Sequence, residues 1–449
     1  MSNKPRLFIA IATEERIANI PPILEMKNTN EDQILWLVSS EAKNKNWVDK
    51  PSELLKNLGV TSFAKVVEVE DDPDDCAKAV AAELEKAIYS RFEKVLVGNG
   101  GQKPTLLALS HALPQGTPLI YGQAQPAELW FWGQGIRGGK QRIPYRKARL
   151  TLDEVLACRG YKKMSNNAKQ FWPAAAAAAV QNNIDWMDCS AGQYGIDHDT
   201  TLKAHQRYRT LAALPDTKDG KINPRAAEHL LPDEFNAWKT QMLEACASRN
   251  GTNQQQLTAL FFLAQAVAKK ARGVRDASKN KNESEQNGIG RAFELAVARR
   301  VRGWLTDRAR EITNFPVLEA WWNTEIKRIG SSTADAEFDI ALVLTNGIIL
   351  SLECKSHVLG EKKDIDARIF NLQQASTGLA LFSICGPLYT EFADDEFYKT
   401  TRDLKANLPS SIKFIPFTLA KQAKNFDCKK SFEEELDELI KPYCPKKCT

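Results

Sequence analysis

The chain lacks the features of a membrane-spanning or disulfide-stabilised protein. No apolar run in its 449 residues approaches the roughly 20 residues that a bilayer-spanning helix needs. Its nine cysteines include no C-x-x-C pair, which predicts reduced thiols packed as small apolar side chains. The opening stretch MSNKPRLFIAIATEE has no small-residue cleavage site and predicts a first strand, not a signal peptide. We therefore expect a cytoplasmic protein with no membrane partner.

Two common nucleotide-binding fingerprints are also missing. The chain has no G-x-x-x-x-G-K-[ST] loop, and no G-x-G-x-x-G follows its first predicted strand. A nucleotide hydrolase or a dinucleotide oxidoreductase is therefore disfavoured. The net charge of +5 is mild, so it is compatible with an anionic partner but does not identify one.

The N-terminal part of the chain alternates short β-rich runs with helical stretches. Strands are predicted at RLFIAIA, QILWLVS, AKVVEVE and KVLVGN, with helices toward Met26 and over 73–89. This alternation predicts a parallel α/β domain over residues 1–148. From residue 149 to 274 the pattern becomes mainly helical and predicts a connecting region. Residues 275–289, rich in Lys, Asn, Glu and Ser, are predicted to form a flexible linker and a domain boundary.

A second α/β pattern follows over residues 290–449. A helix is predicted at GRAFELAVARRVRGWL, then a strand at 324–329 and a β-hairpin. A helix over 366–380 and strands at ALFSIC and IKFIPF complete the order. The C-terminal domain is thus predicted to run α-β-β-β-α-β.

The hairpin, AEFDIALVLTNGIILSLECK, ends at Lys355, and its register decides which side chains share a face. A two-residue turn at the N-G pair would mix apolar and charged residues on one face. A three-residue T-N-G loop, with Gly347 in the left-handed conformation, separates them and places Asp339 opposite Glu353. The apolar face would then comprise Phe338, Ile340, Leu342, Leu344, Ile348, Leu350, Leu352 and Cys354.

The other face of this hairpin carries a chemically useful set. Asp339 and Glu353 are oxygen ligands that suit Mg²⁺ or Mn²⁺, and Lys355 would stabilise the charge that builds during phosphodiester cleavage. The alternative is a half-exposed hairpin whose outer face is simply charged and solvated. A lone E-x-K would favour that alternative, because 41–43 and 361–363 match it too.

The element order and these residues resemble the PD-(D/E)xK nucleases. The resemblance implies a restriction-endonuclease-like fold and a metal-dependent endonuclease. It also implies that Asp339, Glu353 and Lys355 are catalytic, with the first two binding the metal. In that family an acidic residue on the first helix often completes the metal site, and Glu294 in RAFELAVA matches its position. A solvated helical glutamate is the alternative for Glu294.

In the N-terminal domain, ligands are expected beyond the carboxyl ends of the parallel strands. There the sequence GNGGQK offers two glycines, a lysine and a helix start at Pro104, which together favour an anionic ligand. An ordinary glycine turn is the alternative. The candidate ligand-binding residues are Thr13, Glu14, Glu15, Arg16, Ser39, Ser40, Asn99, Gly100, Gly101, Gln102 and Lys103.

GNGGQK after the fourth strand resembles the ligand loop of CRISPR-associated Rossmann-fold (CARF) sensors. RLTLDEVLACRGY is similar to the junction in CARF proteins that end in a PD-(D/E)xK nuclease. With all parts in order, the chain resembles the ancillary nucleases of type III CRISPR antiviral systems. The resemblance implies a homodimer that binds cyclic oligoadenylate, most often the four-membered ring, as an allosteric activator and cleaves DNA or RNA.

Three other functions were weighed against this one. HEPN ribonucleases carry R-x4-6-H, and none of the five histidines has an arginine at that distance in a suitable helix. A constitutive restriction or repair nuclease, and a ligand-gated nucleic-acid-binding regulator without cleavage, both stay open.

Overall fold

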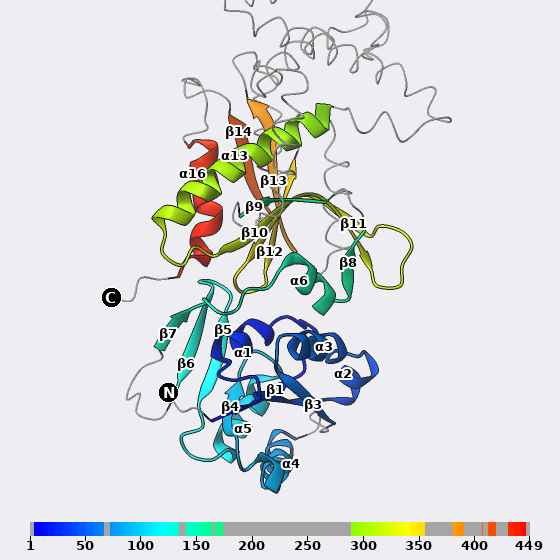
Figure 1. Ribbon diagram of the computed structural model, residues 1–449, viewed down its shortest axis with the longest axis vertical. Helices are drawn as coiled ribbons and strands as arrows, with labels where there is room; N and C mark the ends of the chain where they lie inside the picture. The colour runs from blue at the N-terminus through cyan, green and yellow to red at the C-terminus, as the bar shows by residue number, and fades with distance from the viewer. Residues whose placement is uncertain are drawn as a thin grey trace, which may run out of the picture.

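The computed structural model describes residues 4–66, 72–133, 141–164, 168–173, 289–354, 380–389, 406, 412–418 and 430–445. They form two units stacked along the long axis of the molecule, each built on one β-sheet (Figure 1). Each sheet has seven strands, so the protein is mixed α/β. Among these residues no helix is both long and apolar enough to cross a membrane.

The first sheet grows outward from β1 (Arg6–Ile11), whose six residues are all buried. A continuous apolar strand suits a parallel sheet that helices cover on both faces. β1 pairs in parallel with β2 (Gln33–Val38) on one side and β4 (Glu93–Val97) on the other. The strand order β3-β2-β1-β4-β5-β6-β7 therefore has a topological switch point between β1 and β4. The other elements of this part are α1 (Ile20–Met26), α2 (Ser40–Asn44), α3 (Asp49–Asn57), β3 (Thr61–Val66), α4 (Pro73–Leu84), η1 (Ala87–Tyr89) and α5 (Lys103–Ala112).

The first sheet differs from the prediction in three places. β3 begins at Thr61, before the predicted start at residue 64, because it pairs with β2 from there. The end of the predicted AKVVEVE strand, from residue 67, lies outside the described residues. The helix that starts at Pro73 ends at Leu84, and a separate 3-10 turn follows it. The sheet is mixed, because two strands beyond β5 run antiparallel to it or to each other. β5 spans Leu119–Gln123, and the two strands beyond it are β6 (Glu128–Trp132) and β7 (Gln141–Pro144).

The second sheet has the order β14-β13-β12-β11-β10-β8, with β9 also paired to β10. The predicted first helix is present as α13, and β10 starts at Val317 instead of near residue 324. The predicted strands ALFSIC and IKFIPF are also present, whereas the helix predicted over 366–380 falls almost wholly within 355–379, outside the described residues. The elements are α13 (Ile289–Glu311), β10 (Val317–Arg328), β11 (Ala336–Leu344), β12 (Ile349–Cys354), β13 (Ala380–Tyr389) and β14 (Lys413–Thr418).

The start of the predicted connecting region belongs to this second sheet. After α6 (Leu152–Cys158) come two short strands, β8 (Tyr161–Lys163) and β9 (Lys169–Trp172), which both pair antiparallel with β10. Strands on both sides of 174–288 are thus in one sheet. The rest of the predicted helical region and the 275–288 part of the predicted linker lie outside the described residues.

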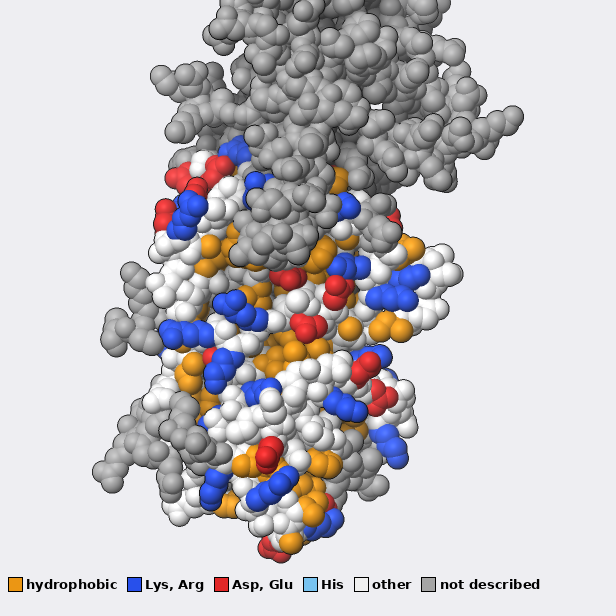
Figure 2. Space-filling model, viewed as in Figure 1, with side chains coloured by type: hydrophobic (Ala, Val, Ile, Leu, Met, Phe, Trp, Pro, Cys, Tyr) orange, Lys and Arg blue, Asp and Glu red, His pale blue; other side chains and the backbone are white. Residues whose placement is uncertain are grey.

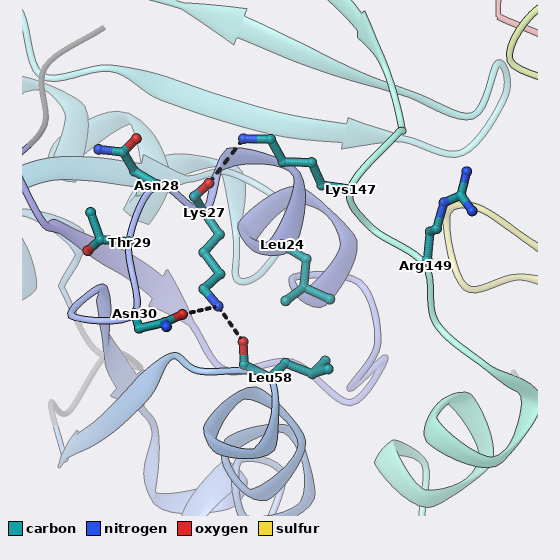
Figure 3. A pocket seen from close by; sticks show the side chains of 8 residues that line it. All are labelled: Leu24, Lys27, Asn28, Thr29, Asn30, Leu58, Lys147 and Arg149. Carbon is teal, nitrogen blue, oxygen red and sulfur yellow. Dashed lines mark hydrogen bonds between the residues drawn. The ribbon is translucent and has the colours of Figure 1, made fainter.

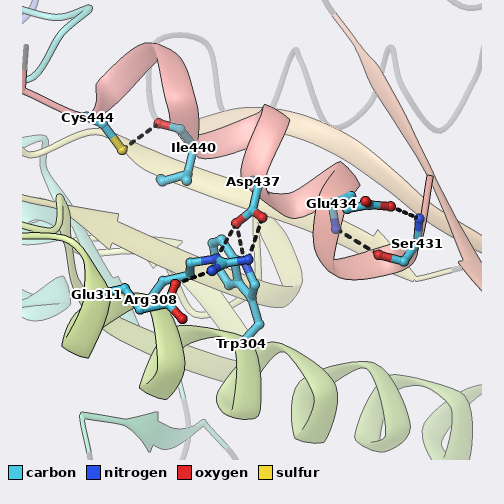
Figure 4. Close-up of polar contacts among 8 residues, drawn as sticks. All are labelled: Trp304, Arg308, Glu311, Ser431, Glu434, Asp437, Ile440 and Cys444. Atoms are coloured by element: carbon cyan, nitrogen blue, oxygen red, sulfur yellow. Dashed lines mark hydrogen bonds and ion pairs between the residues drawn. The ribbon is translucent and has the colours of Figure 1, made fainter.

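The C-terminal helix α16 (Phe432–Ile440) is fixed to α13 by charged hydrogen bonds (Figure 4). The Asp437 carboxylate accepts the Trp304 indole N–H at 2.7 Å and two Arg308 N–H groups at 2.7 and 2.8 Å. Arg300 forms a forked pair with Glu433 one turn earlier on each helix, with contacts of 2.6 to 2.9 Å. Forked arginine–carboxylate pairs fix orientation as well as distance. The two helices therefore pack as one layer on the second sheet.

A single apolar core joins the two units. One cluster of buried side chains contains Phe8 and Trp36 from the first sheet together with Phe338 and Leu342 from the second. A separate cluster fills the opposite face of the first sheet, beneath α4 and α5. Because one core is shared, a shift in either unit has to be accommodated by the other.

Candidate nuclease and ligand sites

The hairpin of β11 and β12 has the predicted register. Ile340 pairs with Leu352 and Leu342 with Leu350, which fixes a three-residue loop over 345–347. Gly347 has φ of 76°, and its N–H donates to the Leu344 carbonyl at 2.9 Å. The three-residue loop with a left-handed glycine is confirmed, and the two-residue turn is excluded.

This register places Asp339 and Glu353 opposite each other on adjacent strands. Asp339 is 5% exposed and Glu353 is 4% exposed. One Asp339 carboxylate oxygen accepts the backbone N–H of Cys354 at 2.6 Å, which fixes the orientation of that carboxylate. The alternative of a solvated, charged outer face is therefore wrong, because both faces of the hairpin are buried.

Glu294, on α13, affects the pKa of Cys354, the residue that follows Glu353. The pKa of the Cys354 thiol lies well above its usual range, first because of burial, then through Cys385, and further through the Asp339 and Glu294 carboxylates. In the part of the chain that the structure describes, however, no three His, Cys, Asp or Glu side chains converge closely enough to hold a metal ion. Lys355 lies just outside the described residues. The structure thus pairs two of the four predicted catalytic residues across adjacent strands.

Two carboxylates are enough to fit a magnesium-type ion. Mg²⁺ binds through one or two carboxylates and takes its remaining ligands from water and substrate phosphate. Asp339 and Glu353 supply oxygen donors from neighbouring strands at a nearly buried position. Burying two carboxylates is unfavourable, and the positive charge of a bound cation would offset that cost. The residues present therefore fit the Mg²⁺ or Mn²⁺ ion that the sequence predicts.

The candidate ligand residues of the first unit gather at the switch point. The loop over 12–16 follows β1, the loop over 98–103 follows β4, and these two strands are neighbours. Gly100 lies so close to the end of β1 that a Cβ there would be 2.0 Å from the Ile11 carbonyl oxygen. Close backbone contact thus requires glycine at this position, whether or not a ligand binds.

Several of these candidates already contact other parts of the protein. Asn99 exchanges two hydrogen bonds with the backbone of Gly122, at 2.7 and 2.6 Å, and so ties its loop to β5. Ser39 caps α2 by accepting the Ala42 N–H. Glu15 pairs with Arg159 at 2.7 Å, and Arg16 donates to the Lys45 carbonyl at 3.3 Å. The exposed candidates are Glu14, Glu15, Ser40, Gly101, Gln102 and Lys103, with Thr13 half-buried.

The first loop and the tip of the hairpin are in contact, a feature that the sequence analysis missed. Next to the loop, Ile17 packs on Gly347, where an added Cβ would be 2.8 Å from the Ile17 side chain. The Asn346 amide also donates to the Ala124 carbonyl of the first unit at 3.0 Å. The hairpin therefore reaches from the first unit at its tip to Asp339 and the opposite strand at its base. The only signal in the sequence was the N-G pair, which indicated a turn and not its partner.

The structure is thus a two-unit α/β protein with a switch-point loop cluster in one unit and paired carboxylates in the other. No protein-family model matches the chain, and no curated protein matches it significantly. Among solved structures, the fold is similar to that of protein VC1899 from Vibrio cholerae. The TM-score is 0.54 at 13% identity, over 98% of this chain and 99% of that one.

Two further solved structures are similar in fold. Can2 from Sulfobacillus thermosulfidooxidans, solved in complex with cyclic tetra-adenylate, matches with a TM-score of 0.51 at 16% identity, over 97% of this chain and 99% of that one. A type III CRISPR defence DNA nuclease activated by cyclic oligoadenylate matches with a TM-score of 0.51 at 13% identity, over 99% of this chain and 53% of that one. At these identities the likeness shows a shared fold, and it supports the CARF-type fold expected from the sequence.

Proposed function

We propose that the chain is a metal-dependent nuclease that a cyclic oligoadenylate, bound at the switch point of the first sheet, activates for antiviral defence. The observation that carries the nuclease assignment is the hairpin register, which sets Asp339 opposite Glu353 in the buried centre of the second sheet. The fold likeness to Can2 with cyclic tetra-adenylate favours the four-membered ring as activator. A homodimer, in which two first units share one ring, is part of the proposal.

The roles of the residues follow from their positions. Asp339 and Glu353 would hold the ion between adjacent strands, and the Cys354 N–H keeps the Asp339 carboxylate oriented. A bound Mg²⁺ or Mn²⁺ supplies a Lewis acid for the scissile phosphate and a water of lowered pKa. Lys355, which follows the last residue of β12 in the sequence, is proposed to stabilise the charge that builds on the phosphate, and Glu294 to assist from α13.

Activation would pass through the contact between the first loop and the hairpin tip. A ring bound at the switch point would displace the loop over 13–16, and Ile17 would transmit that displacement to Gly347. Because β11 and β12 are a rigid paired ladder, a movement at the tip changes the position of the carboxylates at the base. By this route the messenger would bind more tightly to one arrangement of the carboxylates than to the other. Such a difference in affinity is what allows a ligand to activate a site.

The test is a cleavage assay of the purified chain with Mg²⁺ or Mn²⁺ and cyclic tri-, tetra- or hexa-adenylate. Supercoiled DNA, single-stranded DNA and RNA serve as substrates. We expect cleavage that depends on both metal and messenger, and a loss of at least 100-fold in Asp339→Asn, because the neutral amide is a poor ligand for a hard cation.

Ser351→Ala is the matched control for that variant. Ser351 is buried on β12, which pairs with the strand that carries Asp339, and its hydroxyl finds no hydrogen-bond partner among the described residues. We expect this variant to cleave normally. Metal-dependent cleavage by Asp339→Asn would rule out the site. Full activity without messenger would instead indicate a constitutive nuclease, and nucleic-acid binding without cleavage would indicate a regulator.

A further inference from the structure

A groove lined with basic residues runs along the junction of the two units. It consists of two adjoining pockets, of about 420 and 510 Å³, which share Arg149. Among the residues that the structure describes, neither pocket is lined by Asp or Glu. Figure 2 shows Lys and Arg side chains around this junction on the face in view, with Asp and Glu side chains among them. We name this surface the basic groove; its cations are Lys27, Arg146, Lys147, Arg149 and Arg310.

The segment that supplies three of these cations is held by its backbone. The buried Glu25 carboxylate accepts the N–H groups of Arg146, Lys147 and Ala148 at 2.7, 2.8 and 3.2 Å. The acidic group thus anchors the chain and does not pair with the cationic side chains. The cationic side chains of this segment are therefore not neutralised by the carboxylate that holds its backbone.

The cationic groups of the groove are held mainly by neutral acceptors. Lys27 donates to Asn30 and to the Leu58 carbonyl, and Lys147 donates to the Lys27 carbonyl at 3.2 Å (Figure 3). Arg149 Nε donates to the Arg146 carbonyl at 3.4 Å, and its guanidinium stands clear of the other seven side chains drawn in Figure 3. Within the described chain, Arg310 has the only carboxylate neighbour of the five, an exposed Asp307 at 4.0 Å. These positive charges thus stay available to an anionic partner.

The shape of the groove favours a nucleic-acid strand over a small anion. Two adjoining pockets with cations in both suit successive phosphates of one strand, whereas a single phosphate would occupy one pocket. Each pocket also has apolar lining, Leu24 and Leu58 in one and Phe315 and Leu318 in the other, on which exposed bases can pack. A duplex hides its bases in the stack, so the lining suits a single strand.

We propose that the basic groove binds the sugar-phosphate backbone of single-stranded nucleic acid, and so guides the substrate of the nuclease. This inference rests on the proposed function for its purpose, but the binding itself does not need cleavage. Its test is therefore a binding measurement on the full chain in EDTA, by fluorescence anisotropy with a labelled single-stranded oligonucleotide.

Arg149→Glu should weaken oligonucleotide binding about tenfold at 0.1 M salt, and Arg149→Gln less. Each lost phosphate contact should also reduce the slope of log Kd against log salt by about 0.7. Lys78→Glu is the matched control, because it makes the same charge change on α4, where the side chain is 77% exposed and far along the chain from the groove residues. That control should leave binding unchanged.

Equal binding by all three variants and the parent would overturn the groove proposal, even if the messenger activates cleavage. Displacement of the oligonucleotide by excess cyclic tetra-adenylate, or a change of oligomeric state in Arg149→Glu, would overturn it too, since the groove would then serve the messenger or a second copy. Loss of binding in Arg149→Glu, with no cleavage by the parent under any condition, would support the groove and reject the proposed function.

Discussion

Asn346 offers a sharp test of communication between the two units, because its amide makes one bond within the hairpin loop and one across the junction. Its oxygen accepts the Ile348 N–H at 3.2 Å, and its nitrogen donates to the Ala124 carbonyl at 3.0 Å. Asn346→Asp keeps the first bond and removes the second, whereas Asn346→Ala removes both. The pair of variants therefore separates the shape of the loop from its contact with the first unit.

The expected magnitude follows from that one bond. A neutral hydrogen bond contributes about 0.5 to 1.5 kcal/mol net, which corresponds to a change of about 2- to 12-fold in an equilibrium constant. If the contact transmits activation, both variants should lower the ratio of messenger-stimulated to unstimulated cleavage by about that factor. Asp should be at the upper end, since its charge also faces a carbonyl oxygen. The affinity for the messenger should be retained, because neither of these hydrogen bonds of Asn346 involves a candidate ligand-binding residue.

The assay compares single-turnover cleavage rates with and without saturating cyclic tetra-adenylate, and titration calorimetry gives the affinity for the ring. A lowered ratio in both variants, at unchanged affinity, supports the proposed route. An unchanged ratio in Asn346→Asp would refute the reasoning, and a loss confined to Asn346→Ala would assign the effect to the loop bond alone.

Two further predictions concern stability. Gly100→Ala should lower the free energy of unfolding by about 1 to 3 kcal/mol and weaken messenger binding, because its Cβ would overlap the Ile11 carbonyl. Gly303→Ala is its control, since a Cβ there has nothing within 4 Å, and equal denaturant midpoints for the two would contradict the argument. Burial raises the pKa of Glu319, against hydrogen bonds from Trp321 and the Leu152 N–H that lower it. A raised pKa gives stability that is present below the unfolded value of 4.5 and is lost as pH rises through the folded one, so the stability of Glu319→Gln relative to the parent should increase as pH rises above 4.5. Parallel stability curves over that range would reject this assignment.

The sequence predicted those parts of the fold in which the spacing of apolar residues along the chain determines the secondary structure. Asp339, Ser351 and Glu353 share a face, apart from Phe338 and Leu352, only in the register that the T-N-G loop sets, so that register could be predicted. Likewise β1 and its neighbours are short apolar runs between turns, typical of a covered parallel sheet. Chemistry at the base of the hairpin could be predicted for the same reason, since register alone puts Asp339 opposite Glu353.

Other features depend on contacts that leave no local pattern. β8 and β9 have three and four residues, too few to show a period, and they form because β10 offers them an edge. Asn99 was predicted to bind a ligand, yet its amide is used to hold the backbone of Gly122. The bond from Asn346 to Ala124 joins residues 222 positions apart, and nothing near either residue indicates the other.

The position of β9 and α13 on either side of residues 174–288 has a consequence for how such chains can diverge. The chain leaves the second sheet at Trp172 and returns at Ile289, to a helix packed on that same sheet. Residues can therefore be gained or lost between these points without changing the distance from the switch-point loops to the hairpin. Related chains can therefore differ in length between these two points while the two units keep the same arrangement.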